Sequence, residues 1–116
     1  LSNGYPGLAI SAKTRKPVLG NIQGGICGPS LKPLNMLHVW KASQAVDIPI
    51  IALGGIMNAE DAIEYILAGA TAVSVGTANL IDPTTTMKVA AGIEQYLEES
   101  EFSDINELVG LAWKQR

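Results

Sequence analysis

Glycines that follow two apolar runs are the residues whose type and spacing suggest chemistry. The run "IIALGG" (50–55) ends on Gly54 and Gly55, and "VSVGTA" (73–78) reaches Gly76, 22 residues after Gly54. A glycine at a strand end lets a ligand approach the main chain and leaves N–H groups uncrowded by a Cβ atom. Thr77 then opens a short helix, whose first N–H groups would favour an anion. The spacing therefore predicts a phosphate site at these strand ends.

The same glycines have a second interpretation, which the residues alone leave open. Glycine also permits a tight turn between a strand and the following helix, whether or not a ligand binds there. Two successive strand ends and one short extra helix match the phosphate site after strands 7 and 8 of (β/α)8 barrels. This match favours the ligand without excluding the simple turn.

A helix is predicted on each side of the first apolar strand. Residues 33–45 have apolar side chains at helical spacing, namely Leu34, Leu37, Trp40 and Ala45. In the second helix, Asn58 can cap the N-terminus, Asp61 follows at the third helical position and Gly69 ends the helix. Its predicted buried stripe consists of Ala59, Ala62, Ile63, Ile66, Leu67 and Ala70.

The two strands themselves are predicted over 47–55 and 71–76. Their apolar residues do not alternate with polar ones, a pattern typical of parallel strands covered on both faces. A long helix should follow from Asp82 and Pro83, with an apolar face made by Met87, Ala90, Ile93 and Leu97. The acidic residues 98–101 are expected to be a solvated helix end. A last small helix should use Asp104 and Glu107 as a capping pair.

The first part of the chain differs from this α/β pattern. Extended residues 7–11 and 16–21 flank a polar turn and predict a hairpin, whereas the glycine-rich residues 24–33 predict a loop. Lys13, Arg15 and Lys16 should lie at the hairpin tip. They are either solvated or part of a surface that docks a subunit.

Composition limits the class of protein. The 116 residues are 47% hydrophobic and 16% charged, which indicates one well-buried α/β unit over 1–116 and not a disordered chain. A net charge of −3 gives no reason to expect a nucleic acid or an anionic membrane as partner. No apolar stretch reaches the roughly 18 residues of a membrane span. The lone Cys27 argues against an internal disulfide or a cysteine-rich metal site, so we expect a cytoplasmic protein without a metal.

Several of these segments together resemble one enzyme family. "NGYPGLAI", "NIQGGICGPSLKP" and "IPIIALGGIMNAEDAIEYILAGATAVSVGTAN" closely resemble dihydroorotate dehydrogenase, and "GLAIS" with "TRKPVLGN" favours the catalytic subunit of its NAD-linked class. The resemblance implies a flavoprotein with a TIM-barrel fold that holds flavin mononucleotide (FMN). Such an oxidoreductase converts dihydroorotate to orotate in pyrimidine biosynthesis and passes electrons to a subunit with FAD and an iron–sulfur cluster.

The resemblance also implies roles for individual residues. The residues at flavin-contacting positions are Ser2, Gly28, Gly54, Gly55, Gly76 and Thr77. Asn3 and Gly4 fall on a pair, usually Asn-Thr, that holds the substrate, so one hydroxyl is missing here. The catalytic base of the family lies upstream, and no catalytic residue is assigned in this chain. Cys27 is expected to be a packed small side chain and His38 a surface or hydrogen-bonded histidine. Lys32 should lie at the start of a helix.

The matched segments correspond to the C-terminal part of a (β/α)8 TIM barrel, about strands 7–8 with their helices, after an N-terminal hairpin. Two parallel strands cannot close a barrel, so we expect free strand edges, an uncovered face and no turnover by the chain alone. The remainder of the barrel, as another chain, or a homo-oligomer would cover that face. Two alternatives stay open: another flavin- or phosphate-binding TIM-barrel enzyme, or a truncated, non-catalytic assembly element.

Overall fold

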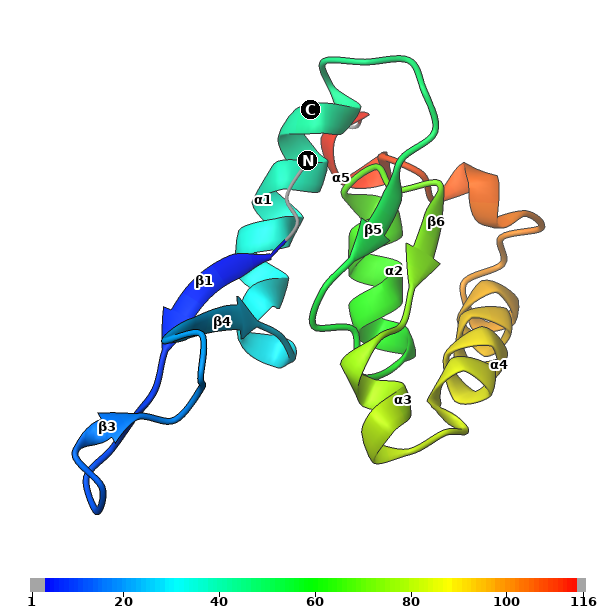
Figure 1. The fold of residues 1–116 in the computed structure, drawn as a ribbon. Helices are drawn as coiled ribbons and strands as arrows, with labels where there is room; N and C mark the ends of the chain where they lie inside the picture. Colours follow the sequence, from blue (N-terminus) through cyan, green and yellow to red (C-terminus); the bar gives the residue numbers. More distant parts are fainter. Residues whose placement is uncertain (1–3, 115–116) are drawn as a thin grey trace.

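The computed structural model describes residues 4–114, which form three two-stranded sheets and several helices (Figure 1). The strands are β1 (Tyr5–Leu8), β2 (Ile10–Ser11), β3 (Lys16–Pro17), β4 (Gln23–Ile26), β5 (Ile51–Leu53) and β6 (Ala72–Ser74). The α-helices are α1 (Lys32–Ser43), α2 (Ala59–Leu67), α3 (Thr77–Ile81), α4 (Thr85–Glu99) and α5 (Leu111–Lys114). Two 3-10 helices are η1 (Pro29–Leu31) and η2 (Ile105–Glu107).

Two antiparallel strand pairs form a hairpin arm, defined here as residues 5–26. β1 pairs with β4, and β2 pairs with β3 nearer the tip. The predicted hairpin is confirmed for residues 10–11 and 16–17, whereas residues 18–21 form bends and a turn, not a strand. The loop prediction was wrong for residues 24–26, which belong to β4. Pairing with β1 provides the hydrogen bonds that a glycine-rich segment needs to become a strand, and this tertiary contact overrides the local preference.

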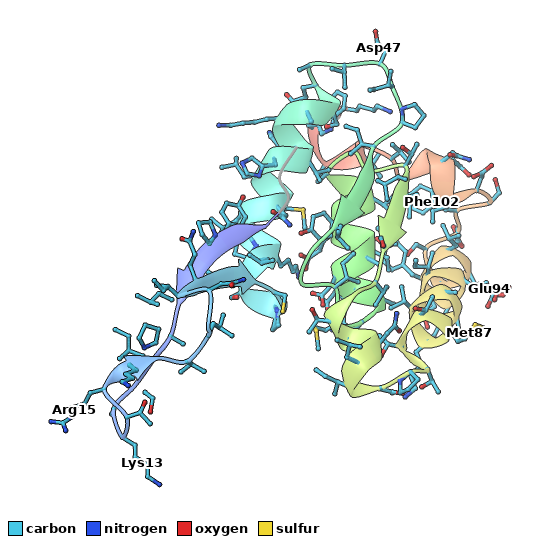
Figure 2. All side chains as sticks on the ribbon, viewed as in Figure 1. Lys13, Arg15, Asp47, Met87, Glu94 and Phe102 are labelled. Atoms are coloured by element: carbon cyan, nitrogen blue, oxygen red, sulfur yellow. The ribbon has the colours of Figure 1, made fainter. Side chains whose placement is uncertain are left out.

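The hairpin arm projects away from the rest of the molecule, with Lys13 and Arg15 at its tip (Figure 2). The chain measures 56 × 33 × 20 Å and its radius of gyration is 16.7 Å, against about 13 Å for a compact domain of this length. The predicted position of the basic cluster is confirmed. Docking of a subunit at this tip stays a prediction.

The remaining elements follow the predicted order of helices and parallel strands. β5 and β6 pair in parallel, with Ile51 opposite Ala72 and Leu53 opposite Ser74. In Figure 1, α2 lies behind these strands, with α1 on one side and α4 on the other. The core between them contains Val39, Ile50, Ala52, Ile56, Ala62, Tyr65, Ala68, Ala70 and Val89.

The parallel pair is covered on one face only within residues 4–114. Ala52 is buried, whereas Ile51 is 70% exposed and Leu53 is 54% exposed. The prediction of strands covered on both faces was therefore wrong for this chain. The expected uncovered face is confirmed, because two strands present half of their apolar side chains to whatever completes the sheet.

The terminal signals of the helices were predicted better than their buried faces. Asn58 accepts a hydrogen bond from the N–H of Asp61, Gly69 has a φ of +118°, and Asp104 with Glu107 forms the predicted capping box. The long helix α4, however, begins at Thr85, not at Pro83. Asp82 instead accepts hydrogen bonds from the N–H and hydroxyl of Thr84 in the preceding turn.

The stripe predicted for α2 is confirmed at Ala62, Ile63 and Ile66, which are buried. The faces predicted for α1 and α4 are confirmed only in part, at Trp40 and Ile93, which pack against the core. In α4, Met87 is 73% exposed and points outward (Figure 2), while Thr85 and Val89 are buried. In α1, Leu34 and Leu37 are exposed and Val39 is buried. An apolar stripe identifies a face that can be buried, but the covering surface must also be present.

None of the helices within residues 4–114 combines the length and apolar character that crossing a lipid bilayer requires.

Candidate phosphate-binding site

Segments far apart in the sequence meet around one pocket of about 250 Å³ at the carboxyl ends of β5 and β6. Five of the predicted cofactor residues line it, namely Gly28, Gly54, Gly55, Gly76 and Thr77. The other lining residues are Ile26, Cys27, Leu31, Asn35, Leu53, Ile56 and Met57. The structure thus brings the two strand ends together with the segment that follows β4.

Side chains of α1 and α2 hold the loop that leaves β5. The amide Nδ2 of Asn35 donates to the carbonyl of Leu53 at 2.7 Å. The hydroxyl of Tyr65 donates to the carbonyl of Gly54 at 2.8 Å and also lies 3.2 Å from the carbonyl of Lys32. Two successive carbonyls of this loop are therefore fixed by side chains.

The far end of the same loop is held by a carboxylate. Asp61 accepts a hydrogen bond from the N–H of Met57 at 2.9 Å and forms an ion pair with Lys32. Lys32 also lies 2.7 Å from Glu64. Partial burial alone would raise the pKa of Asp61, but the hydrogen bonds from Lys32 and Met57 lower it overall. The ionised carboxylate is therefore the form that this loop conformation favours.

The glycines differ in what their missing side chains make possible. Gly54 and Gly55 have φ angles of +120° and +72°. A Cβ atom on Gly54 would overlap the Asn35 amide, and one on Gly55 would lie 2.9 Å from the main-chain nitrogen of Lys32. The turn interpretation is thus sufficient to explain both glycines, and it leaves the ligand interpretation untested there.

Gly28 and Gly76 have open space where a Cβ atom would be. No atom of residues 4–114 lies within 4 Å of that position at Gly28, although its φ of +94° still favours glycine. At Gly76 the nearest atom within the same residues is Leu53 Cδ1 at 4.0 Å, with φ at −107° and ψ at −95°. The contacts among residues 4–114 give no reason for glycine at position 76.

The charge around the pocket is compatible with an anion. None of the twelve lining residues carries a charged side chain. Asp61 and Glu64 share the ammonium group of Lys32, so the three groups together keep one negative charge, but neither carboxylate lines the pocket. A phosphate in the pocket would meet main-chain amides and the Thr77 hydroxyl.

The other predicted residues have different positions. Ser2 and Asn3 lie outside the described residues. Gly4 precedes β1 with a φ of +108° and does not line the pocket. Cys27 is exposed at the pocket rim, so the prediction of a packed side chain was wrong. Within residues 4–114, the segment around Cys27 contacts the ends of β5 and β6 on one side only, so the Cys27 side chain stays exposed.

His38 and Lys32 behave as expected. The ring of His38 stacks on Tyr5, and the two side chains are joined by a hydrogen bond of 3.0 Å. Lys32 is the first residue of α1. Neither side chain lines the pocket.

Sequence reasoning missed Asn35 and Tyr65, which act on the glycine loop from 18 and 11 residues away. Their hydrogen bonds join distant segments, and no local spacing announces such a contact. The one signal in the sequence is that Tyr65 stands in α2 at a position where an apolar residue would be expected.

A sequence model described as dihydroorotate dehydrogenase matches residues 3–97. The chain belongs to this family. It is 58% identical over 106 residues to the catalytic subunit of dihydroorotate dehydrogenase B (NAD(+)) from Desulforamulus reducens, covering 91% of this chain and 35% of that protein. The same subunit from Geotalea daltonii is 53% identical over 110 residues, with 95% and 36% covered. The chain therefore spans about a third of the length of these relatives.

A solved structure of a dihydroorotate dehydrogenase has the same arrangement. The enzyme from Eimeria tenella, crystallised in complex with ferulenol, superposes with a TM-score of 0.72 at 26% identity. The match covers 90% of this chain and 29% of that one. The α/β arrangement described above is thus that of one part of a larger dihydroorotate dehydrogenase.

Proposed function

We propose that this chain forms the FMN phosphate-binding end of a dihydroorotate dehydrogenase with a TIM-barrel fold. The observation that carries the proposal is the single pocket lined by Gly28, Gly54, Gly55, Gly76 and Thr77. These residues come from three separate segments, and the sequence pattern together with the family resemblance predicts a ligand-binding role for all five. Family membership adds the expectation of a flavin.

Main-chain groups would hold the phosphate. The N–H of Gly55 has no acceptor among residues 4–114, and Gly55 lines a pocket without charged side chains. Thr77 adds a hydroxyl from the other strand end. The open space beside Gly28 and Gly76 leaves room for the rest of the nucleotide. FMN itself supplies the hydride-accepting ring, and the protein anchors and orients it.

The substrate would be dihydroorotate, oxidised to orotate in pyrimidine biosynthesis. Asn3 and Gly4 are the proposed substrate contacts in this chain, and Ser2 is a further proposed flavin contact. The base that removes a substrate proton would come from outside this chain. As in the relatives named as catalytic subunits of an NAD(+) enzyme, electrons would pass to a partner, for which we propose a subunit with FAD and an iron–sulfur cluster in the cytoplasm.

The rest of the barrel would cover the exposed face of β5 and β6. Ile51 and Leu53 present a large apolar surface there. The unpaired N–H and C=O groups of a strand edge can also pair with another strand. About two thirds of each relative lies outside the matched segment, which is enough chain to complete the sheet. We therefore expect activity only when this chain is combined with that part.

A chimera tests this proposal. In it, this chain replaces the matched segment of the Desulforamulus reducens catalytic subunit. We expect the purified chimera to carry FMN, seen in its absorption spectrum, and to oxidise dihydroorotate but not dihydrouracil. The unaltered Desulforamulus reducens subunit is the control. A folded chimera without FMN would contradict the phosphate site, and oxidation of dihydrouracil alone would indicate a different flavin enzyme.

A further inference from the structure

We infer that Tyr65, assisted by Asn35, is a positioning residue that aims a main-chain N–H of the Gly54–Gly55 turn at the phosphate. The inference rests on the proposed function and adds two residues that act through the main chain of the glycine loop. Both act through the loop that follows β5, from the helices on either side of it.

The geometry of one peptide group carries the argument. In a trans peptide the carbonyl and the following N–H point in opposite directions. Because the carbonyl of Gly54 accepts a hydrogen bond from Tyr65 on α2, the N–H of Gly55 points away from α2. Within residues 4–114 that N–H has no acceptor, and Gly55 is one of the residues that line the pocket. A bound anion would provide one.

Tyr65 is well suited to fix this peptide. Its side chain has an exposure of 0%, so packing restricts its rotation. Burial raises the pKa of its hydroxyl to about 12, which keeps the group protonated and able to donate near neutral pH. Without this hydroxyl, the carbonyl of Gly54 would lose its partner in a largely buried place, and the peptide could rotate.

Asn35 fixes the preceding peptide. Its amide donates to the carbonyl of Leu53 and occupies the space where a Cβ atom on Gly54 would be. Two successive carbonyls are thus turned toward helices, and the glycine turn has little freedom left. Since Gly54 and Gly55 can adopt many conformations, side chains must select the one that serves binding.

The test compares FMN with riboflavin, which lacks the phosphate. In the chimera freed of flavin, Tyr65→Phe should weaken FMN binding about tenfold, measured by flavin fluorescence, because tenfold corresponds to about 1.4 kcal/mol, the size of one lost hydrogen bond. Riboflavin affinity should stay within about twofold. Asn35→Ala should weaken FMN binding by a smaller factor of about three to five and also spare riboflavin.

Tyr96→Phe is the matched control, because Tyr96 lies on α4 and its hydroxyl has no hydrogen-bond partner among residues 4–114. It should change neither affinity. Equal weakening of FMN and riboflavin by Tyr65→Phe would overturn the inference and leave a purely structural role. If Tyr65→Phe does not fold, Asn35→Ala decides by the same criterion. A wild-type chimera that binds both flavins equally would overturn the phosphate site itself, and the positioning role with it.

Discussion

The two strand ends that border the pocket carry the same pattern, an apolar strand followed by glycine, for different reasons. After β5, the chain itself requires Gly54 and Gly55, because the turn has positive φ angles and Asn35 and Lys32 fill the space beside it. After β6, Gly76 has a negative φ and open space where a Cβ atom would be. The first end is packed against side chains, whereas at the second no atom of residues 4–114 lies closer than 4.0 Å to that Cβ position.

This difference separates two causes that a glycine pattern cannot distinguish. At the β5 end, a ligand is unnecessary to explain the residue type. At the β6 end, no contact within residues 4–114 explains the residue type, and we propose a bound phosphate or the rest of the barrel as its cause. Substitutions at the two ends should therefore act on different properties.

The largest effect is expected at the β5 end. In the chimera, Gly55→Ala would place a methyl group 2.9 Å from the main-chain nitrogen of Lys32 and 3.0 Å from the carbonyl of Gly28, at a φ of +72°. We expect a loss of about 2–4 kcal/mol in the free energy of unfolding, measured by urea denaturation. Gly20→Ala, in the hairpin arm with open space around it, is the control. A loss no greater than that of the control would show that the β5 end is not packed as described.

The opposite result is expected at the β6 end. Gly76→Ala should leave the free energy of unfolding within about 0.5 kcal/mol of the wild-type value, since no atom is closer than 4.0 Å. It should nevertheless weaken FMN binding by about tenfold, because the methyl group would take space that we assign to the phosphate. Fluorescence titration with FMN and urea denaturation of the same protein measure both quantities. Unchanged affinity for FMN would remove Gly76 from the proposed site and leave the rest of the barrel as its explanation.

Local signals predicted the elements around the two ends, whereas long-range contacts did not follow from them. Asn58 and Gly69 mark the two ends of α2 as predicted, because a cap acts within one helical turn. The apolar residues Leu34 and Met87 were assigned to buried faces and are exposed, because burial depends on a partner surface. The pocket itself was anticipated from the interval between Gly54 and Gly76.

The support of that pocket was not anticipated. Tyr65 and Asn35 reach main-chain carbonyls of another segment, and a single sequence carries no spacing that reports such a bond. The sequence also did not indicate that Gly54 packs against the side chains of Asn35 and Leu31. Sequence patterns thus located the strand ends, and only the packed structure separated their causes.

The smallest expected effect concerns how the free energy of unfolding depends on pH at the two strand ends. Asp61 holds the β5 loop through the N–H of Met57, and among residues 4–114 no carboxylate has this role at the β6 end. In the chimera, Asp61→Asn should lower the free energy of unfolding at pH 7 by about 1 kcal/mol, since a partly exposed ion pair and a hydrogen bond to a charged group are weakened.

The same variant predicts a pH dependence with a definite sign. Because the folded-state pKa of Asp61 is lowered, its contribution is complete above the ordinary value near 4 and disappears as the pH falls through the folded value. The difference between wild type and Asp61→Asn, measured by urea denaturation from pH 7 to pH 3, should therefore shrink below about pH 4. Glu94→Gln on the outer face of α4 (Figure 2) is the control and should give no such trend. A difference that stays constant to pH 3 would mean that the ionised carboxylate does not hold the loop, and that the glycine turn after β5 depends on packing alone.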